Sequence, residues 1–240
     1  GRTQPLYSFI APGSDGHTEH CLKSIEAMAE TYIEAMQTVD PEGPYYLGGY
    51  SMGGLVAYEM ALQLERKGFK TAQLIIFDAM APWYDQTRME YTEEKYDQEL
   101  LKLAEEILNF FGKEMLLKLS DIEGKSKEEK LNTALRMINE STDMEASVSQ
   151  LRAYMELGMD SILLENNYCP KKVKLDQVPI LILQPVADVT AKPDTLGWEE
   201  FTTGALTNIP LQGGDHEDFM SQPHVKNVAQ ALQQHLLNDL

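Results

Sequence analysis

The chain has little positive charge for its size. Lys and Arg together number 20, whereas Asp and Glu number 38, and the net charge is −18 at pH 7. Nucleic acids and anionic membranes attract proteins through basic faces, so this balance argues against both as partners. Any acidic partner would have to dock through apolar contacts or local basic spots.

Cysteine and long apolar runs are also scarce. The two cysteines, Cys21 and Cys169, have neither metal-binding nor redox spacing, which favours reduced thiols in a cytoplasmic protein. No signal peptide is recognisable, and no apolar run is long enough to cross a bilayer. His17 and His20 form an H-x-x-H pattern near Cys21, but further ligands are lacking, so we expect solvated loop histidines, no metal and no permanently bound cofactor.

The remaining composition is that of an ordinary globular protein, with 43% hydrophobic residues among 240. Strands are indicated by apolar stretches at 6–10, 45–47, 74–77, 179–184 and 208–211. Helical patterns alternate with them at 24–39, 55–64 and 225–237. The alternation predicts an α/β fold with a mostly parallel sheet and helices on both faces.

The most specific motif is Gly49-x-Ser51-x-Gly53, between an apolar run and a helical pattern. It is the nucleophile-elbow pattern of α/β-hydrolases, in which a strand reverses sharply into a helix and exposes the serine hydroxyl. We expect no room for side chains at Gly49 and Gly53, and we expect Gly54 to let the helix pack close to the sheet. Ser51 is therefore the predicted nucleophile.

Asp78 and His216 are the predicted partners of Ser51. Asp78 ends the next strand, and a βαβ return places the carboxyl ends of both strands side by side. Capping the following turn is the structural alternative for this carboxylate, and Asp188, after the 179–184 strand, is the reserve candidate for the acid. His216 follows the last strand in a glycine-opened loop, where the histidine of these hydrolases belongs.

Residues 83–170 interrupt the α/β rhythm. Helices are predicted there over 96–111, 114–119, 127–139 and 144–166, with no convincing strand between them. So long an insertion between two sheet strands is typical of a lid over a site. We therefore expect a core formed by 1–82 and 171–240, with 83–170 as a helical lid.

The chain resembles the thioesterase domains that terminate non-ribosomal peptide synthetases and polyketide synthases. The resemblance is carried by residues 24–32 (SIEAMAETY), 43–61 (GPYYLGGYSMGGLVAYEMA), 74–82 (LIIFDAMAP), 197–198 (GW) and 213–216 (GGDH). It is most specific from 24 to 82 and good from 178 onward, and the insertion matches in position alone.

This resemblance implies a serine hydrolase with Ser51, Asp78 and His216 as its triad and the Met52 backbone amide as an oxyanion donor. It implies an acyl thioester substrate, delivered on the phosphopantetheine arm of a peptidyl or acyl carrier domain and released by hydrolysis or macrocyclisation. An acid at Asp78 matches terminating domains, whereas stand-alone editing thioesterases place theirs one strand later, nearer Asp188.

The opening of the chain departs from the family pattern. Such domains begin with a strand, a loop that supplies one oxyanion amide, and a helix, whereas residues 5–16 resemble the next strand and loop. Either the first βα unit is missing or Ala11-Pro12-Gly13 supplies the amide, so that donor is unassigned. A stand-alone esterase or lipase, a type II editing thioesterase and a non-catalytic docking module are the alternative functions.

Overall fold

The computed structural model describes residues 5–10, 24–82, 92–114, 117–142, 148–170, 174–186 and 195–238. The chain divides into two compact units. The first comprises Gly1–Phe9, Lys23–Gln86 and Tyr168–Leu240, and the second comprises Ile10–Leu22 and Thr87–Asn167.

The first unit is built on a parallel sheet. Its described strands are β1 (Tyr45–Tyr50), β2 (Thr71–Phe77), β3 (Ile180–Pro185) and β4 (Leu206–Leu211), in that spatial order. All three neighbouring pairs are parallel, so the four carboxyl ends lie along one edge of the sheet. The predicted α/β class is confirmed.

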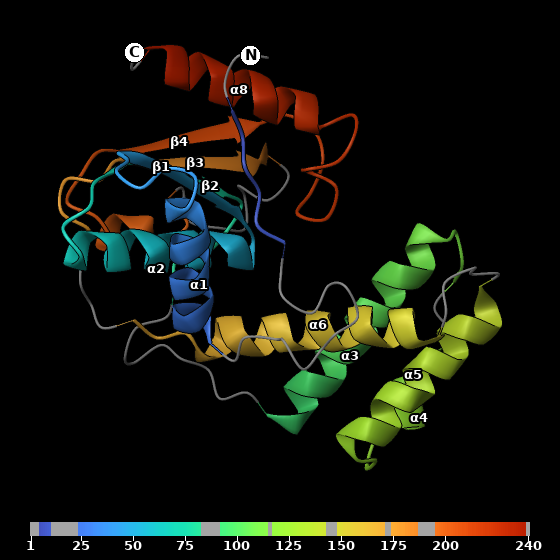
Figure 1. Ribbon diagram of the computed structural model, residues 1–240. Coiled ribbons are helices and arrows are strands. Elements are labelled where there is room, and N and C mark those ends of the chain that lie inside the picture. The colour runs from blue at the N-terminus through green and yellow to red at the C-terminus, as the bar shows by residue number, and fades with distance from the viewer. Residues whose placement is uncertain are drawn as a thin grey trace. The chain divides into compact units, whose positions relative to one another are not determined.

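Helices cover both faces of this sheet (Figure 1). One face carries α2 (Met52–Arg66), with α1 (Ile25–Gln37) packed against it. The other face carries α8 (Val225–Asn238), whose Val228 and Ala231 share a buried cluster with Ile75, Leu181 and Leu183 of the sheet. A short 3-10 helix, η2 (Trp198–Glu200), precedes β4.

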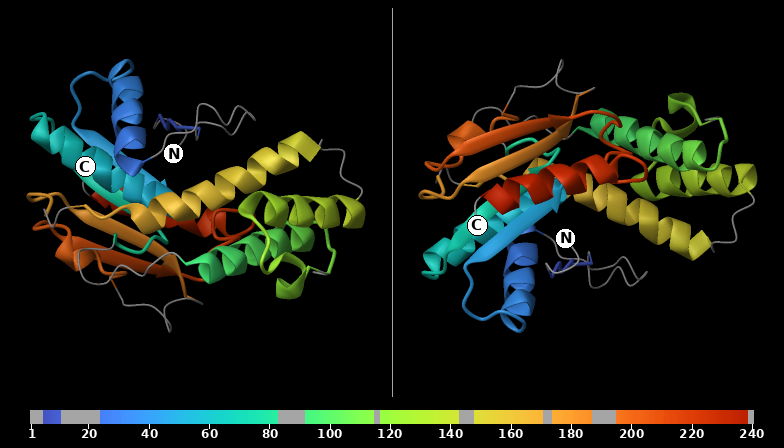
Figure 2. Two further views of the ribbon diagram at one scale, coloured as in Figure 1. Left: turned by 90° about the horizontal axis from the view of Figure 1, so that it is seen from below. Right: turned by 90° about the horizontal axis from the view of Figure 1, so that it is seen from above.

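The second unit is helical where it is described. It contains α3 (Glu93–Phe110), α4 (Leu119–Ile122), α5 (Lys127–Ser141) and α6 (Val148–Asn167), and Figure 2 shows α3 and α5 side by side. Its core is apolar and includes Leu100, Ala104, Leu131, Leu135, Met155 and Met159. The structure thus has helices in three of the four predicted places; that this unit is a lid stays a prediction.

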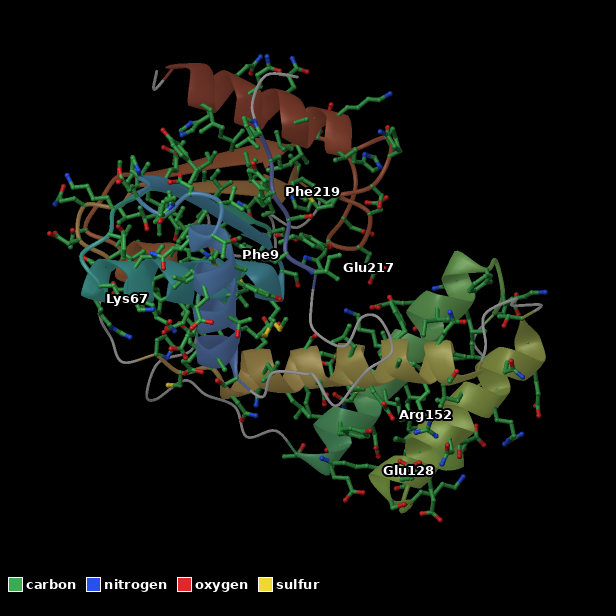
Figure 3. The ribbon with its side chains drawn as sticks, viewed as in Figure 1. Phe9, Lys67, Glu128, Arg152, Glu217 and Phe219 are labelled. Atoms are coloured by element: carbon green, nitrogen blue, oxygen red, sulfur yellow. The ribbon has the colours of Figure 1, made fainter. Side chains whose placement is uncertain are left out.

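Two predicted elements are wrong. The segment 6–10, which carries the Phe9 labelled in Figure 3, is not a strand. Leu6 is 91% exposed, and the Phe9 ring stacks on Tyr32 of α1 with a centroid distance of 4.5 Å. An apolar run is buried only where other segments cover both of its faces, which the run itself does not reveal. Of the predicted helix over 114–119, the described residues 114, 117 and 118 are not helical, and Leu119 is the first residue of α4, where the Asp121 carboxylate accepts the Lys118 amide at 2.8 Å.

Among the helices that the structure describes, none combines the length and the apolar character needed to cross a bilayer.

Candidate active site

Ser51 lies at the sharp reversal between β1 and α2. Its backbone has φ 53° and ψ −130°, a strained conformation for a residue with a side chain. A Cβ at Gly49 would collide with the Gly53 backbone, and one at Gly54 would lie 2.8 Å from the Ala79 Cβ. Gly49 is therefore required by the close approach of α2 to β1, and Gly54 by the close approach of α2 to the segment after β2.

The steric reason predicted for Gly53 is wrong. A Cβ built at this position meets no atom within 4 Å. Only the first of the two motif glycines is thus explained by contact at the turn.

Asp78 follows β2 immediately, next to the end of β1. Tyr50 pairs with Phe77 in the register of these strands, and the Ser51 amide donates to the Phe77 carbonyl at 3.1 Å. Asp78 has a positive φ of 45°, and its amide donates to the Leu183 carbonyl of β3 at 2.9 Å. The parallel register thus brings the two residues to adjacent strand ends, as the βαβ spacing predicts.

His216 connects the two. Its Nε2 lies 3.1 Å from the Ser51 Oγ, and its Nδ1 lies 2.7 Å from the Asp78 Oδ2. The Asp78 side chain is fully buried, whereas that of His216 is 39% exposed. A buried carboxylate accepting from Nδ1 favours the tautomer whose Nε2 is free to accept a proton from the hydroxyl. This geometry can support nucleophilic catalysis by a serine.

The loop between β4 and α8 holds His216 by its own polar groups. The Asp215 carboxylate accepts the amides of Glu217 at 2.9 Å and Asp218 at 3.2 Å, and the Asp218 carboxylate accepts the Asp215 amide at 2.8 Å. Figure 3 shows Glu217 and Phe219 on this loop; Glu217 is exposed and Phe219 is buried in the α8 cluster. Hydrogen bonds within the loop and the buried Phe219 ring thus hold the segment that carries the imidazole.

Trp198 braces the segment that follows Asp78. Its indole Nε1 donates to the Ala79 carbonyl at 2.8 Å, and the Ala81 amide donates to the Leu196 carbonyl at 2.8 Å. Trp198 is fully buried against Tyr58 and Phe201. The sequence indicated this residue only through the family resemblance; nothing in its spacing predicted a contact beside Asp78.

Several of the other residues that the sequence indicated lie outside the described part of the chain. Asp188, residues 11–13 and the histidines at 17 and 20 with Cys21 all fall there. Met52 is the first residue of α2, where backbone amides have no partner within the helix. Among the described side chains, no group of three or more His, Cys, Asp or Glu residues could hold a metal ion.

Comparison with known proteins places the chain among thioesterase domains. The family model described as "Thioesterase domain" matches residues 3–236. Chondramide synthase cmdD from Chondromyces crocatus is 24% identical over 243 residues, covering 98% of this chain and 6% of that synthase. The chain therefore spans only a small part of the length of this curated relative.

Solved structures agree on the fold. One is holo-AB3403, a four domain nonribosomal peptide synthetase bound to AMP and glycine, with a TM-score of 0.76 and 26% identity over 94% of this chain and 17% of that one. Another is the Vlm2 thioesterase domain with genetically encoded 2,3-diaminopropionic acid bound with a dodecadepsipeptide, with a TM-score of 0.61 and 23% identity over 88% of this chain and 74% of that one.

Proposed function

Since this chain belongs to the thioesterase domain family, we propose that it releases acyl or peptidyl chains from the phosphopantetheine arm of a carrier domain through an ester on Ser51. The observation that carries the proposal is the relay from the buried Asp78 carboxylate through His216 to the Ser51 hydroxyl. The relatedness to chondramide synthase and to a four domain synthetase supports the choice of substrate class.

In the acylation half-reaction, the Ser51 oxygen attacks the thioester carbonyl while His216 Nε2 takes its proton. The imidazolium that forms stays paired with Asp78, and it then protonates the departing thiolate of the pantetheine arm. The products are a seryl ester and a free pantetheine thiol.

Backbone groups at the start of α2 stabilise the negative charge that develops on the carbonyl oxygen. The Met52 amide follows the nucleophile directly, and the positive end of the helix dipole lies there. Removing one oxyanion donor costs about 100- to 1000-fold in rate in enzymes of this kind.

In the second half-reaction, His216 activates the nucleophile that attacks the seryl ester. Water releases a free acid, whereas an amine or hydroxyl of the bound chain releases a ring. We assign the choice between them to the 83–170 insertion, as a lid that admits water or folds the chain onto the ester.

The test compares substrates and a nucleophile variant. The parent protein should hydrolyse or cyclise an acyl-pantetheine thioester, presented free or on a carrier domain, faster than the oxygen ester of the same acyl group. Ser51→Ala should abolish that turnover. Strong turnover of the oxygen ester with none of the thioester would favour an esterase, and unchanged release by Ser51→Ala would exclude both enzymatic functions.

A further inference from the structure

We infer that Tyr50 is a positioning residue for His216, holding both its ring and its backbone; the inference rests on the proposed function. The Tyr50 ring and the imidazole are stacked, with centroids 5.1 Å apart and an interplanar angle of 26°. The Tyr50 hydroxyl donates a hydrogen bond to the His216 backbone carbonyl. One side chain thus contacts the base at two separate points.

The location of Tyr50 in the fold makes it a rigid support. It is the last residue of β1 and is paired with Phe77 of β2. Its side chain packs against the buried cluster under α8, which includes Phe219 of the His216 loop. Because Ser51 follows it directly in the chain, the same strand end fixes the nucleophile and, through Tyr50, the base.

The stacked ring acts on the charged form of His216. When His216 accepts the Ser51 proton it becomes an imidazolium, and the face of an aromatic ring within about 6 Å attracts a cation. The neutral imidazole gains less from the same contact, so the interaction strengthens as the transition state forms and speeds the reaction. Such contacts correspond to about 2- to 30-fold in rate.

The hydroxyl acts on the placement of the loop. His216 lies between Asp215 and Glu217 in a turn whose side-chain hydrogen bonds join residues of the loop to one another, and the Tyr50 hydroxyl adds a contact from β1. A neutral hydrogen bond of this kind corresponds to about fivefold in an equilibrium or rate. Its loss should lower the fraction of time in which Nε2 reaches the Ser51 hydroxyl.

The experiment measures labelling of Ser51 by a fluorophosphonate probe, since phosphonylation also needs His216 to activate the serine. Intact mass gives the final labelled fraction, and its time course at several probe concentrations separates the limiting rate constant from probe affinity. The variants are Tyr50→Phe, which keeps the ring, and Tyr50→Leu, which removes ring and hydroxyl. Tyr46→Phe is the matched control, because Tyr46 lies on the same strand with an exposed side chain.

We expect Tyr50→Phe to label completely but with a limiting rate constant about fivefold lower. Tyr50→Leu should be slower by a further factor of about 2 to 30, with probe affinity unchanged in both. Tyr46→Phe should match the parent. A merely structural role would reduce the labelled fraction and leave the rate constant of the labelled molecules unchanged.

Two outcomes overturn the inference alone: parent-like rate constants in both Tyr50 variants, or a loss confined to the labelled fraction. If Tyr50→Leu does not fold, the rate constant of Tyr50→Phe decides by itself. A parent protein that is not labelled at Ser51 contradicts the proposed function itself, and the inference fails with it.

Discussion

At the residue scale, the elbow depends on how closely α2 approaches the sheet. Gly54→Ala places a methyl group 2.8 Å from the Cβ of Ala79, the residue that follows Asp78. We expect a loss of about 1–3 kcal/mol in the free energy of unfolding, because the helix or the loop must move. Urea denaturation measures it.

Gly53→Ala is the matched control for that change. Nothing lies within 4 Å of its Cβ, and Ala is favoured over Gly in a helix, so we expect no loss and a gain of up to about 1 kcal/mol. Equal destabilisation by the two substitutions would contradict the packing described for the elbow.

Asp78→Asn should separate chemistry from binding. An amide in this position can donate to Nδ1 and favour the wrong imidazole tautomer, so kcat should fall by about 10,000-fold. KM should change little, because Asp78 acts on the imidazolium and does not touch the substrate. Steady-state kinetics measures both, and near-ultraviolet circular dichroism checks that the fold is kept. A fall of less than about tenfold would argue against this carboxylate as the acid.

The sequence predicted the three residues that meet at the candidate site, but it did not predict the contacts of the residues packed around them. Ser51, Asp78 and His216 follow from the motif and from strand order, because parallel strands align their carboxyl ends. Tyr50 lies in the same motif, but the distant loop that it contacts is brought there only by the fold. For the same reason, no local pattern predicted the Trp198 hydrogen bond to Ala79.

At the element scale, α5 of the helical unit begins with a capping box. The Glu129 amide donates to the Ser126 hydroxyl oxygen at 3.4 Å, and the Glu129 carboxylate accepts the Ser126 amide at 2.9 Å. Ser126→Ala should lower the stability of α5 by about 1 kcal/mol. Hydrogen exchange of the α5 amides measures the change.

The control for this prediction is Ser120→Ala, which removes an exposed hydroxyl from the short helix α4. It should leave exchange in α5 unchanged. If the two variants exchange alike, the box contributes nothing to α5.

The type of an element was predictable where hydrophobic periodicity extended over several turns. The exact ends of elements were harder to predict. The stripes of α1 and α5 each span several turns, and the structure has helices there. The 6–10 run is only five residues long, and its burial would have required a neighbouring strand that the described residues do not provide. The start of α4 depends on one side-chain contact at Asp121, which hydrophobic periodicity does not register.

At the scale of the whole molecule, the first unit resumes at Tyr168, which is buried against α2. Its hydroxyl donates to the buried Glu59 carboxylate at 2.7 Å, and Gln63 donates to the other oxygen at 3.0 Å. Burial, and then the Glu59 charge, raise the pKa of Tyr168 far above its ordinary value. This contact joins the chain after the insertion to α2, the helix that follows Ser51.

Tyr168→Phe should therefore lower stability in a pH-dependent way. At neutral pH the loss should be about 1–3 kcal/mol, because the buried carboxylate loses a donor. A tyrosine pKa raised by folding gives stability that is complete below the unfolded value of about 10 and is lost as pH rises above it. The parent should thus lose stability at alkaline pH faster than the variant, and the gap between them should narrow.

Urea denaturation across neutral and alkaline pH measures that gap. Tyr46→Phe, at an exposed position of β1, is the control and should track the parent throughout. A gap that stays constant with pH would mean that Tyr168 is not the group that titrates on unfolding.

The α/β class and the four strands β1 to β4 were predictable because buried parallel strands alternate with amphipathic helices. The role of the insertion was not, since helical periodicity identifies elements but not what they cover. The 83–170 assignment as a lid accordingly stays a prediction, to be judged by the products formed.

The most direct test of the account is rapid-quench intact mass spectrometry of the protein mixed with an acyl-pantetheine thioester. We expect a transient gain equal to one acyl group, mapped by peptide analysis to Ser51 and absent from Ser51→Ala. Thioester turnover that persists in Ser51→Ala, or an acyl group mapped to another residue, would contradict it.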